Sequence, residues 1–124
     1  RDGLAASDDA AEAVREFVRT IAHHVEASGF RSGGPLMTVA METATTNERL
    51  NHACRQAYDQ LQGAFEAKLI ESGYAHTQAH DLATFITAAI EGGIVLSRTY
   101  HTGDPLRQIA DQLRLVVEAA KSSL

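Results

Sequence analysis

The sequence predicts an all-α fold of about five helices, and three observations lead to that prediction. Alanine is frequent, runs of β-branched residues are rare, and only 6% of the residues are aromatic, with no tryptophan. Such a composition favours helix over strand. Apolar residues recur at steps of three and four along most of the chain, the spacing that places them on one face of a helix. Residue types that start and stop helices separate these stretches.

Length, charge and cysteine content narrow the class of protein. The 124 residues suffice for one domain with a hydrophobic core. A net charge of −5 argues against direct binding of this domain to the phosphate backbone of a nucleic acid. The single cysteine, Cys54, excludes an internal disulfide and suits a reducing cytoplasm. No signal peptide and no apolar run of about 18 residues is visible, so we expect no membrane segment. The chain begins with Arg1 rather than Met, which leaves room for a segment upstream.

The first predicted helix begins at Asp8 or Asp9 and ends at Ser28–Gly29. Asp9, with Glu12 three residues later, fits a capping box. The apolar residues that recur at helical spacing are Ala10, Val14, Phe17, Val18, Ile21 and Val25. This spacing predicts an inner face that packs against the rest of the chain.

A short second helix is predicted over residues 36–44. The loop before it ends in Pro35, which suits the first turn of a helix. Met37 and Met41 lie on one side of this helix. Methionine is flexible and polarisable, so the pair would suit a surface that adapts to varied ligands. Ordinary core packing is the more frequent use of the residue and remains the alternative.

A long third helix is predicted to open at Thr45 and to end near Ser72. Thr45 and Glu48 form a second capping box, and Gly73 is the stop signal. Its predicted inner stripe consists of Leu50, Ala53, Cys54, Ala57, Tyr58, Leu61, Phe65 and Leu69. A thiol on such a stripe is expected to be buried and inert.

The chain is organised around the next predicted helix, which starts at Thr77 and includes the stretch from Leu82 to Tyr100. Its only polar stripe consists of Thr84, Thr87, Glu91 and Arg98. The remaining surface is apolar or small, and a helix of this kind is buried nearly all round. A domain this small covers only part of such a helix, so we expect a second chain or an apolar ligand to cover the rest.

Two adjacent glycines, Gly92 and Gly93, interrupt the middle of this helix, where each costs about 1 kcal/mol relative to alanine. With Ala88 and Ala89 they form two small-xxx-small pairs, which let another backbone approach closely. The alternative is a helix that kinks or ends at the glycines.

In the last predicted helix Asp104 is the N-cap and Pro105 is the first helical residue. Its apolar stripe consists of Leu106, Ile109, Ala110, Leu113, Val116, Val117 and Ala120. Leu115 falls outside this stripe, so it is expected to be exposed or covered by a partner.

A metal-dependent helical-bundle enzyme is the main alternative from a different functional class. His76 and His80 are four residues apart, which places two imidazoles on one helix face, and Asp81 is adjacent. However, these residues lie at the polar start of a helix, and no second helix supplies a Glu-x-x-His pattern. No catalytic triad, phosphate-binding loop or zinc-cysteine spacing is visible. We therefore expect no enzymatic activity, no metal site and no cofactor.

The order of features resembles a known family. A glycine-rich turn at 33–36 follows the end of the first helix at 28–30, and a short helix ends in Glu42. The long helix, the segment AAIEGGIVLSR and the segment DPLRQIADQL complete the order. Together they resemble the C-terminal ligand-binding and dimerisation domain of TetR-family transcriptional repressors, in particular the LmrA/YxaF-like branch.

The resemblance extends from Asp8 over nearly the whole chain but rests on short motifs. The corresponding segments of the family typically read Gly-Cys-Pro-Leu, Leu-Glu-Gly-Ala and a final Pro-Leu helix. Residues 90–93 and 105–106 match this pattern, whereas Gly34 stands where the family usually has cysteine.

The resemblance implies a cytoplasmic homodimer in which the last two helices of each chain form a four-helix bundle. It also implies a helix-turn-helix domain upstream that binds operator DNA, and a small apolar or aromatic effector whose binding releases the DNA. We expect the effector to contact Phe17, Ile21, His24, Met37, Met41, Tyr58, Phe65 and Phe85. We expect the dimer interface to contain Ala88, Ala89, Gly92, Gly93, Leu96, Leu113 and Val117. A helical adaptor without a ligand remains a third possibility.

Overall fold

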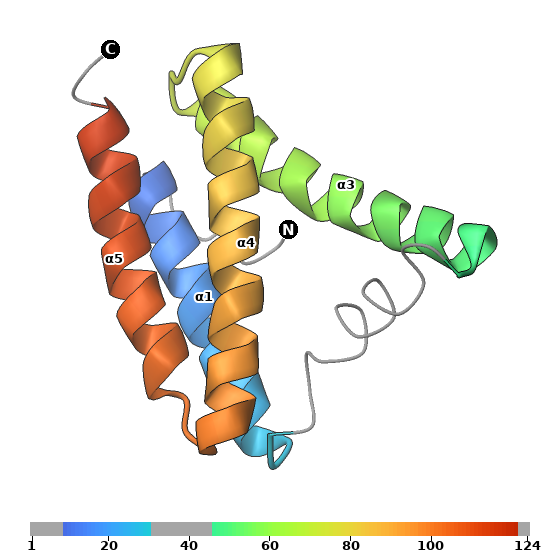
Figure 1. Cartoon of the computed structure of the whole chain (residues 1–124). Coiled ribbons are helices and arrows are strands. Elements are labelled where there is room, and N and C mark those ends of the chain that lie inside the picture. The colour runs from blue at the N-terminus through green and yellow to red at the C-terminus, as the bar shows by residue number, and fades with distance from the viewer. Residues whose placement is uncertain (1–8, 31–45, 122–124) are drawn as a thin grey trace.

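The computed structural model describes residues 9–30 and 46–121, and within them the chain is all-α, as predicted. It contains helices α1 (Ala10–Ala27), α3 (Glu48–Glu71), α4 (His76–Tyr100) and α5 (Asp104–Lys121). Figure 1 shows α1, α4 and α5 running side by side, whereas α3 leaves this group at an angle. The predicted short helix over 36–44 lies outside the described residues.

Helix α1 begins where the sequence predicts. The Asp9 carboxylate accepts a hydrogen bond from the backbone N–H of Ala11 at 3.0 Å, which satisfies one of the free donors of the first turn. Glu12, the expected partner in the capping box, instead pairs with Arg15 at 3.0 Å. At the other end, Gly29 has a φ of 68°, the left-handed conformation that commonly terminates a helix.

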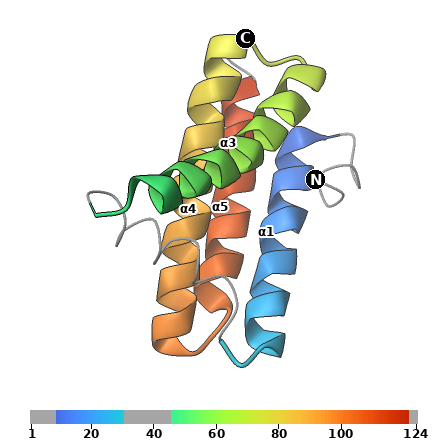
Figure 2. The ribbon, with the colours of Figure 1, turned by 90° about the vertical axis from the view of Figure 1, so that its right-hand side faces the viewer.

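Helix α3 begins at a different cap from the predicted one. The Asn47 side chain accepts a hydrogen bond from the backbone N–H of Leu50 at 3.1 Å, so Asn47 is the N-cap. The predicted cap, Thr45, lies outside the described residues. Leu50 was expected on the inner stripe, but it is 45% exposed. In Figure 2 the start of α3 extends past the other helices, so within residues 9–30 and 46–121 its first turn has little to pack against.

Helix α4 continues through both glycines without a break, which excludes the kinked alternative. A Cβ atom on Gly93 would lie 2.7 Å from Ile109 Cδ1 and 2.8 Å from Leu106 Cδ2. The same atom on Gly92 would meet nothing within 4 Å. Gly93 therefore lets α5 of the same chain approach closely, whereas Gly92 faces outward.

Helix α5 starts one residue earlier than predicted. The backbone N–H of Arg107 donates to the Gly103 carbonyl at 3.1 Å, so Asp104 is already the first helical residue rather than the cap. A shift of one residue is within the usual uncertainty of a helix boundary. Leu115 is 52% exposed, as its place outside the apolar stripe predicts.

The core forms where α1, α4 and α5 meet, with the second half of α3 closing one side. Its largest fully buried side chains are Phe65, Leu69, Ile86, Ile90, Leu106, Leu113, Val14, Val18, Val25 and Val117. The hydroxyl of Tyr74, in the turn between α3 and α4, donates to the Val117 carbonyl at 2.7 Å. This buried bond fixes the turn to the last part of α5.

The opposite end of the bundle is closed by polar contacts. The Glu26 carboxylate of α1 accepts a hydrogen bond from the Gly103 N–H at 3.1 Å and pairs with Arg107 of α5. The Phe30 ring stacks on His101, with centroids 5.5 Å apart and planes inclined by 12°. These contacts join the end of α1 to the turn between α4 and α5.

By length and composition, α4 could cross a membrane, contrary to the expectation from the sequence. The mean hydropathy of its most apolar stretch is 1.3, and 39% of that stretch is buried inside the chain. The core helix of a soluble protein meets the same criterion, so this property alone is weak support for a membrane span.

Candidate functional site

The seam between α3 and α4 is held together by three pairs of polar side chains. His80 Nδ1 and Glu66 Oε1 are 2.6 Å apart, and the Thr84 hydroxyl donates to Gln62 at 3.1 Å. The third pair, Tyr58 and Glu91, lies nearest to the start of α3, and the Tyr58 hydroxyl donates to Glu91 Oε2 at 2.9 Å.

The pKa values of both members of the Tyr58–Glu91 pair are shifted, because both side chains are partly buried. Burial raises the pKa of the Glu91 carboxyl above its usual value, while the hydrogen bond from Tyr58 opposes that shift. Burial, with the neighbouring carboxylate, raises the pKa of Tyr58 to about 12. At neutral pH the tyrosine is thus a neutral donor, and the Glu91 carboxyl has lost part of its hydration.

The predicted effector-binding residues do not all come together. Phe17 and Phe65 meet edge to face, with ring centroids 5.5 Å apart. Phe65 is completely buried, and Phe17 and Ile21 are partly buried against the same core. Tyr58 lies two turns from Phe65 along α3. Of these four residues, Phe17 and Phe65 are in direct contact, and Phe65 has no exposed surface.

The other four predicted residues are not part of that group. His24 is exposed, because the buried face of α1 is centred on Val18 and Val25. Phe85 is 51% exposed and points away from the core. Met37 and Met41 lie outside the described residues.

The predicted dimer-interface residues divide into two groups. Gly93, Leu113 and Val117 are buried within the chain, and Gly93 lies directly against Leu106 and Ile109 of α5. The second group is exposed or half-buried and consists of Ala88, Ala89, Gly92 and Leu96. Sequence periodicity does not separate the two groups, because a face that packs inside the chain and a face that packs outside it are both apolar.

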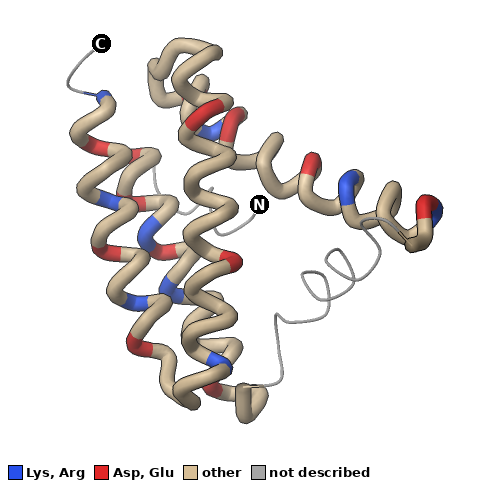
Figure 3. Tube along the Cα trace, viewed as in Figure 1, with Lys and Arg blue, Asp and Glu red and all other residues tan. Residues whose placement is uncertain are grey.

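The exposed side of α4 forms an apolar surface, which we call the outer face. It consists of Phe85, Ala88, Gly92, Val95, Leu96 and Tyr100 on α4 and Gln112, Val116 and Ala119 on α5. None of these residues is charged. Figure 3 shows how few charges α4 carries, and the helix contains only Asp81, Glu91 and Arg98 as charged residues.

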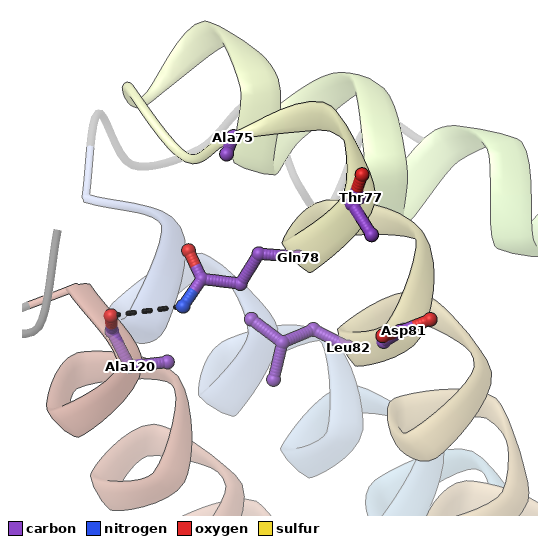
Figure 4. A pocket seen from close by; sticks show the side chains of 6 residues that line it. All are labelled: Ala75, Thr77, Gln78, Asp81, Leu82 and Ala120. Carbon is purple, nitrogen blue, oxygen red and sulfur yellow. Dashed lines mark hydrogen bonds between the residues drawn. The ribbon is translucent and has the colours of Figure 1, made fainter.

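A hollow of about 520 Å³ lies between the start of α4 and the end of α5. Its lining consists of Ala75, Thr77, Gln78, Asp81, Leu82 and Ala120, drawn in Figure 4. Gln78 Nε2 donates to the Ala120 carbonyl at 3.0 Å, while Gln78 Oε1 is buried without a hydrogen-bond partner among the described residues. The hollow is open to solvent, and its lining shares no residue with the outer face.

The histidines at the start of α4 do not form a metal site with their neighbours. His80 is bound to Glu66 of α3, and both His76 and Asp81 are exposed. Across residues 9–30 and 46–121, no three His, Cys, Asp or Glu side chains come close enough together to hold a metal ion.

Comparison with known proteins assigns this helical arrangement to a family. Residues 10–112 match the family described as "Transcriptional regulator LmrA/YxaF-like, C-terminal domain". The chain therefore belongs to this family of TetR-type transcriptional regulators, which confirms the resemblance inferred from its motifs. This membership also places it among regulators rather than enzymes.

Two relatives come from Bacillus subtilis (strain 168). The chain is 35% identical over 111 residues to the HTH-type transcriptional regulator YxaF, covering 90% of this chain and 58% of YxaF. It is 32% identical over 109 residues to the HTH-type transcriptional regulator LmrA, covering 88% of this chain and 58% of LmrA. The chain thus spans somewhat more than half the length of these relatives.

Sequence reasoning missed one residue of this site. Glu91 was assigned to the polar stripe of α4 but not to the effector-binding group. Its position in the sequence could have identified it as a candidate, because it is the only charged residue between Leu82 and Ser97. Its contact with Tyr58 required knowledge of how α3 and α4 pair.

Proposed function

We propose that the chain is the effector-binding and dimerisation domain of a cytoplasmic TetR-like transcriptional repressor. A second copy of the chain covers the outer face, and a helix-turn-helix domain upstream of Arg1 binds operator DNA. A small apolar or aromatic effector binds near α3 and thereby releases the DNA. The observation that carries this proposal is the uncharged, exposed apolar face along α4 and α5.

The outer face has the chemistry of an interface between copies of one chain. Phe85 and Leu96 are 51% and 45% exposed, which is costly in water for large apolar side chains. Gly92 and Ala88 are small, so a second helix can approach the backbone of α4 there. A stable dimer of this type buries about 1,600 Å².

The expected symmetry fits the position of this face. A two-fold axis would bring the outer faces of α4 and α5 of two copies together as a four-helix bundle. Gly93, Leu113 and Val117 are then buried within each copy rather than between copies. The interface consists instead of Phe85, Ala88, Gly92, Leu96 and Val116 with their neighbours.

DNA binding is assigned to the upstream domain rather than to this one. The net charge of −5 disfavours contact with a phosphate backbone. YxaF and LmrA are named as HTH-type regulators, and both are considerably longer than the part that this chain matches. In a dimer, a ligand that changes the packing of α3 against α4 could alter the spacing of two upstream domains and so weaken operator binding.

Sedimentation equilibrium at micromolar concentration tests the dimer. We expect the wild-type chain to sediment as a dimer and Leu96→Glu as a monomer, because the substitution buries a charge in the apolar interface. The matched control is Leu50→Glu. Leu50 has the same exposed fraction of 45% as Leu96 but lies on the projecting part of α3.

Leu50→Glu should leave the dimer intact. A monomeric wild-type chain, or a dimer that Leu96→Glu leaves intact, would refute the proposed interface. Circular dichroism of both variants checks that the helical content is unchanged, so a loss of association is not mistaken for unfolding.

A further inference from the structure

The Glu91 carboxyl lies where burial disfavours its charged form. One turn away on the same side of α4 are Thr87 and Ile94, which are 5% and 6% exposed. On α3, Cys54 lies one turn from Tyr58 and is 5% exposed. Desolvation of a carboxylate in such a place is unfavourable, and it raises the pKa of Glu91.

The partly buried acids elsewhere in the described residues have cationic or titratable partners. Glu26 pairs with Arg107, Glu12 with Arg15 at 3.0 Å, and Glu66 with His80. Glu91 differs, because no arginine, lysine or histidine of residues 9–30 and 46–121 forms an ion pair with it. Its hydrogen bond comes from the neutral hydroxyl of Tyr58.

One oxygen of Glu91 remains accessible. Tyr58 donates to Oε2, and Oε1 accepts no hydrogen bond from the described residues. Oε1 is also not among the fully buried side-chain atoms that lack a partner. Oε1 therefore retains some contact with solvent on a half-buried side chain.

The position of the pair in the fold suits a ligand. Three hydrogen-bonded pairs connect α3 to α4, and Tyr58–Glu91 is the one nearest to the start of α3. Beyond this pair α3 diverges from α4, as Figure 1 shows. In the other direction along α3, Phe17 packs edge to face on Phe65; Phe65 is completely buried, so only the half-buried Phe17 retains exposed aromatic surface.

We infer that Glu91 recognises a positive charge on the effector, so that the effector is an apolar or aromatic amine protonated at neutral pH. Its ammonium group donates to Oε1, and Tyr58 holds the carboxylate in position through Oε2. A charge-assisted bond of this kind supplies the missing countercharge. This inference rests on the proposed function and names the chemical class of the effector.

Three probes that share one ring system test the inference by isothermal titration calorimetry at pH 7. They are 1-naphthylmethylamine, which is cationic, 1-naphthylmethanol, which is neutral, and 1-naphthoate, which is anionic. We expect the amine to bind most tightly. Glu91→Gln should weaken binding of the amine by about ten- to hundredfold, as expected for loss of a hydrogen bond to a charged group, and change binding of the alcohol far less.

The matched control is Asp59→Asn, which removes the same charge from an exposed residue adjacent to Tyr58. It should leave the affinity for the amine nearly unchanged. The melting temperature of Glu91→Gln at pH 7 should equal or exceed that of the wild type, because the substitution removes a desolvated charge. A purely structural Glu91 would instead give a lower melting temperature and no selective loss of the amine.

Equal affinities for amine and alcohol, or an equal loss for both in Glu91→Gln, would overturn the inference. Absence of saturable binding of the amine up to millimolar concentration would overturn it as well. Either result leaves the dimer, which sedimentation tests separately, unaffected.

Discussion

At the scale of single residues, the two adjacent glycines of α4 have different roles. The Gly93 side of the helix lies against Leu106 and Ile109 of α5, whereas Gly92 opens onto the outer face. An added methyl group at Gly93 would need both neighbouring side chains to move. The fold therefore requires a residue without a side chain at Gly93. At Gly92 the uncovered backbone is instead available for contact with a partner.

Comparison of Gly93→Ala with Gly63→Ala measures that requirement. Gly63 is an exposed residue within α3, and a Cβ atom there would meet nothing within 4 Å. Gly63→Ala should therefore raise the free energy of unfolding by about 1 kcal/mol through helix propensity. Gly93→Ala gains the same propensity but loses about 1–3 kcal/mol to overpacking, so it should be neutral or destabilising.

Urea denaturation followed by circular dichroism provides both values. Equal stabilisation by the two substitutions would show that α5 does not approach Gly93 as closely as the structure indicates.

At the scale of elements, α1 and α3 have similar polar caps but very different surroundings. The first turn of α1 is buried, since Ala10, Ala11 and Ala13 are at most 1% exposed. The first turns of α3 are exposed and project from the bundle (Figure 2). The start of α1 therefore unfolds with the whole domain, whereas the start of α3 can open by itself.

Removal of each cap should reveal this difference. Asp9→Ala should lower the global free energy of unfolding by about 1 kcal/mol, the usual cost of losing an N-cap. Asn47→Ala should leave global stability nearly unchanged but speed amide hydrogen exchange in the first turns of α3. Hydrogen exchange with mass spectrometry distinguishes local opening from global unfolding. A global loss of similar size in both variants would contradict the independence of the start of α3.

At the scale of the whole molecule, two distant contacts hold the bundle at opposite ends. Tyr74 binds the Val117 carbonyl at one end, and Glu26 joins Gly103 and Arg107 at the other. The pairing with Arg107, together with the Gly103 N–H, holds the pKa of Glu26 below its ordinary value of 4.5. Because this pKa is lowered by folding, the contribution of Glu26 to stability is present above pH 4.5 and is lost as the pH falls through the lowered pKa.

Glu26→Gln should therefore lower the melting temperature at pH 7. The difference from the wild type should shrink once the pH falls below 4.5, as the wild-type carboxylate becomes protonated. Glu71→Gln, at the exposed end of α3, controls for the change in net charge. A difference that stays constant down to the lowest pH at which the domain is folded would show that the charge of Glu26 does not stabilise the bundle.

The sequence by itself determined the helical class, the extents of α1, α4 and α5 to within a residue or so, and the family. Helix caps, periodicity and short motifs are local, so they can be read without knowledge of the packing. The cap of α3 was misplaced because Thr45 and Asn47 are both suitable caps and lie two residues apart.

Only the tertiary structure decided which apolar residues pack inside the chain. Leu113 and Leu96 look alike in the sequence, yet Leu113 is 2% and Leu96 45% exposed. The contact of Tyr58 with Glu91 likewise depends on how two helices cross, 33 residues apart in the chain. Periodicity determines which face of a helix is apolar, but burial depends on what lies opposite that face, and this is a property of the assembled fold.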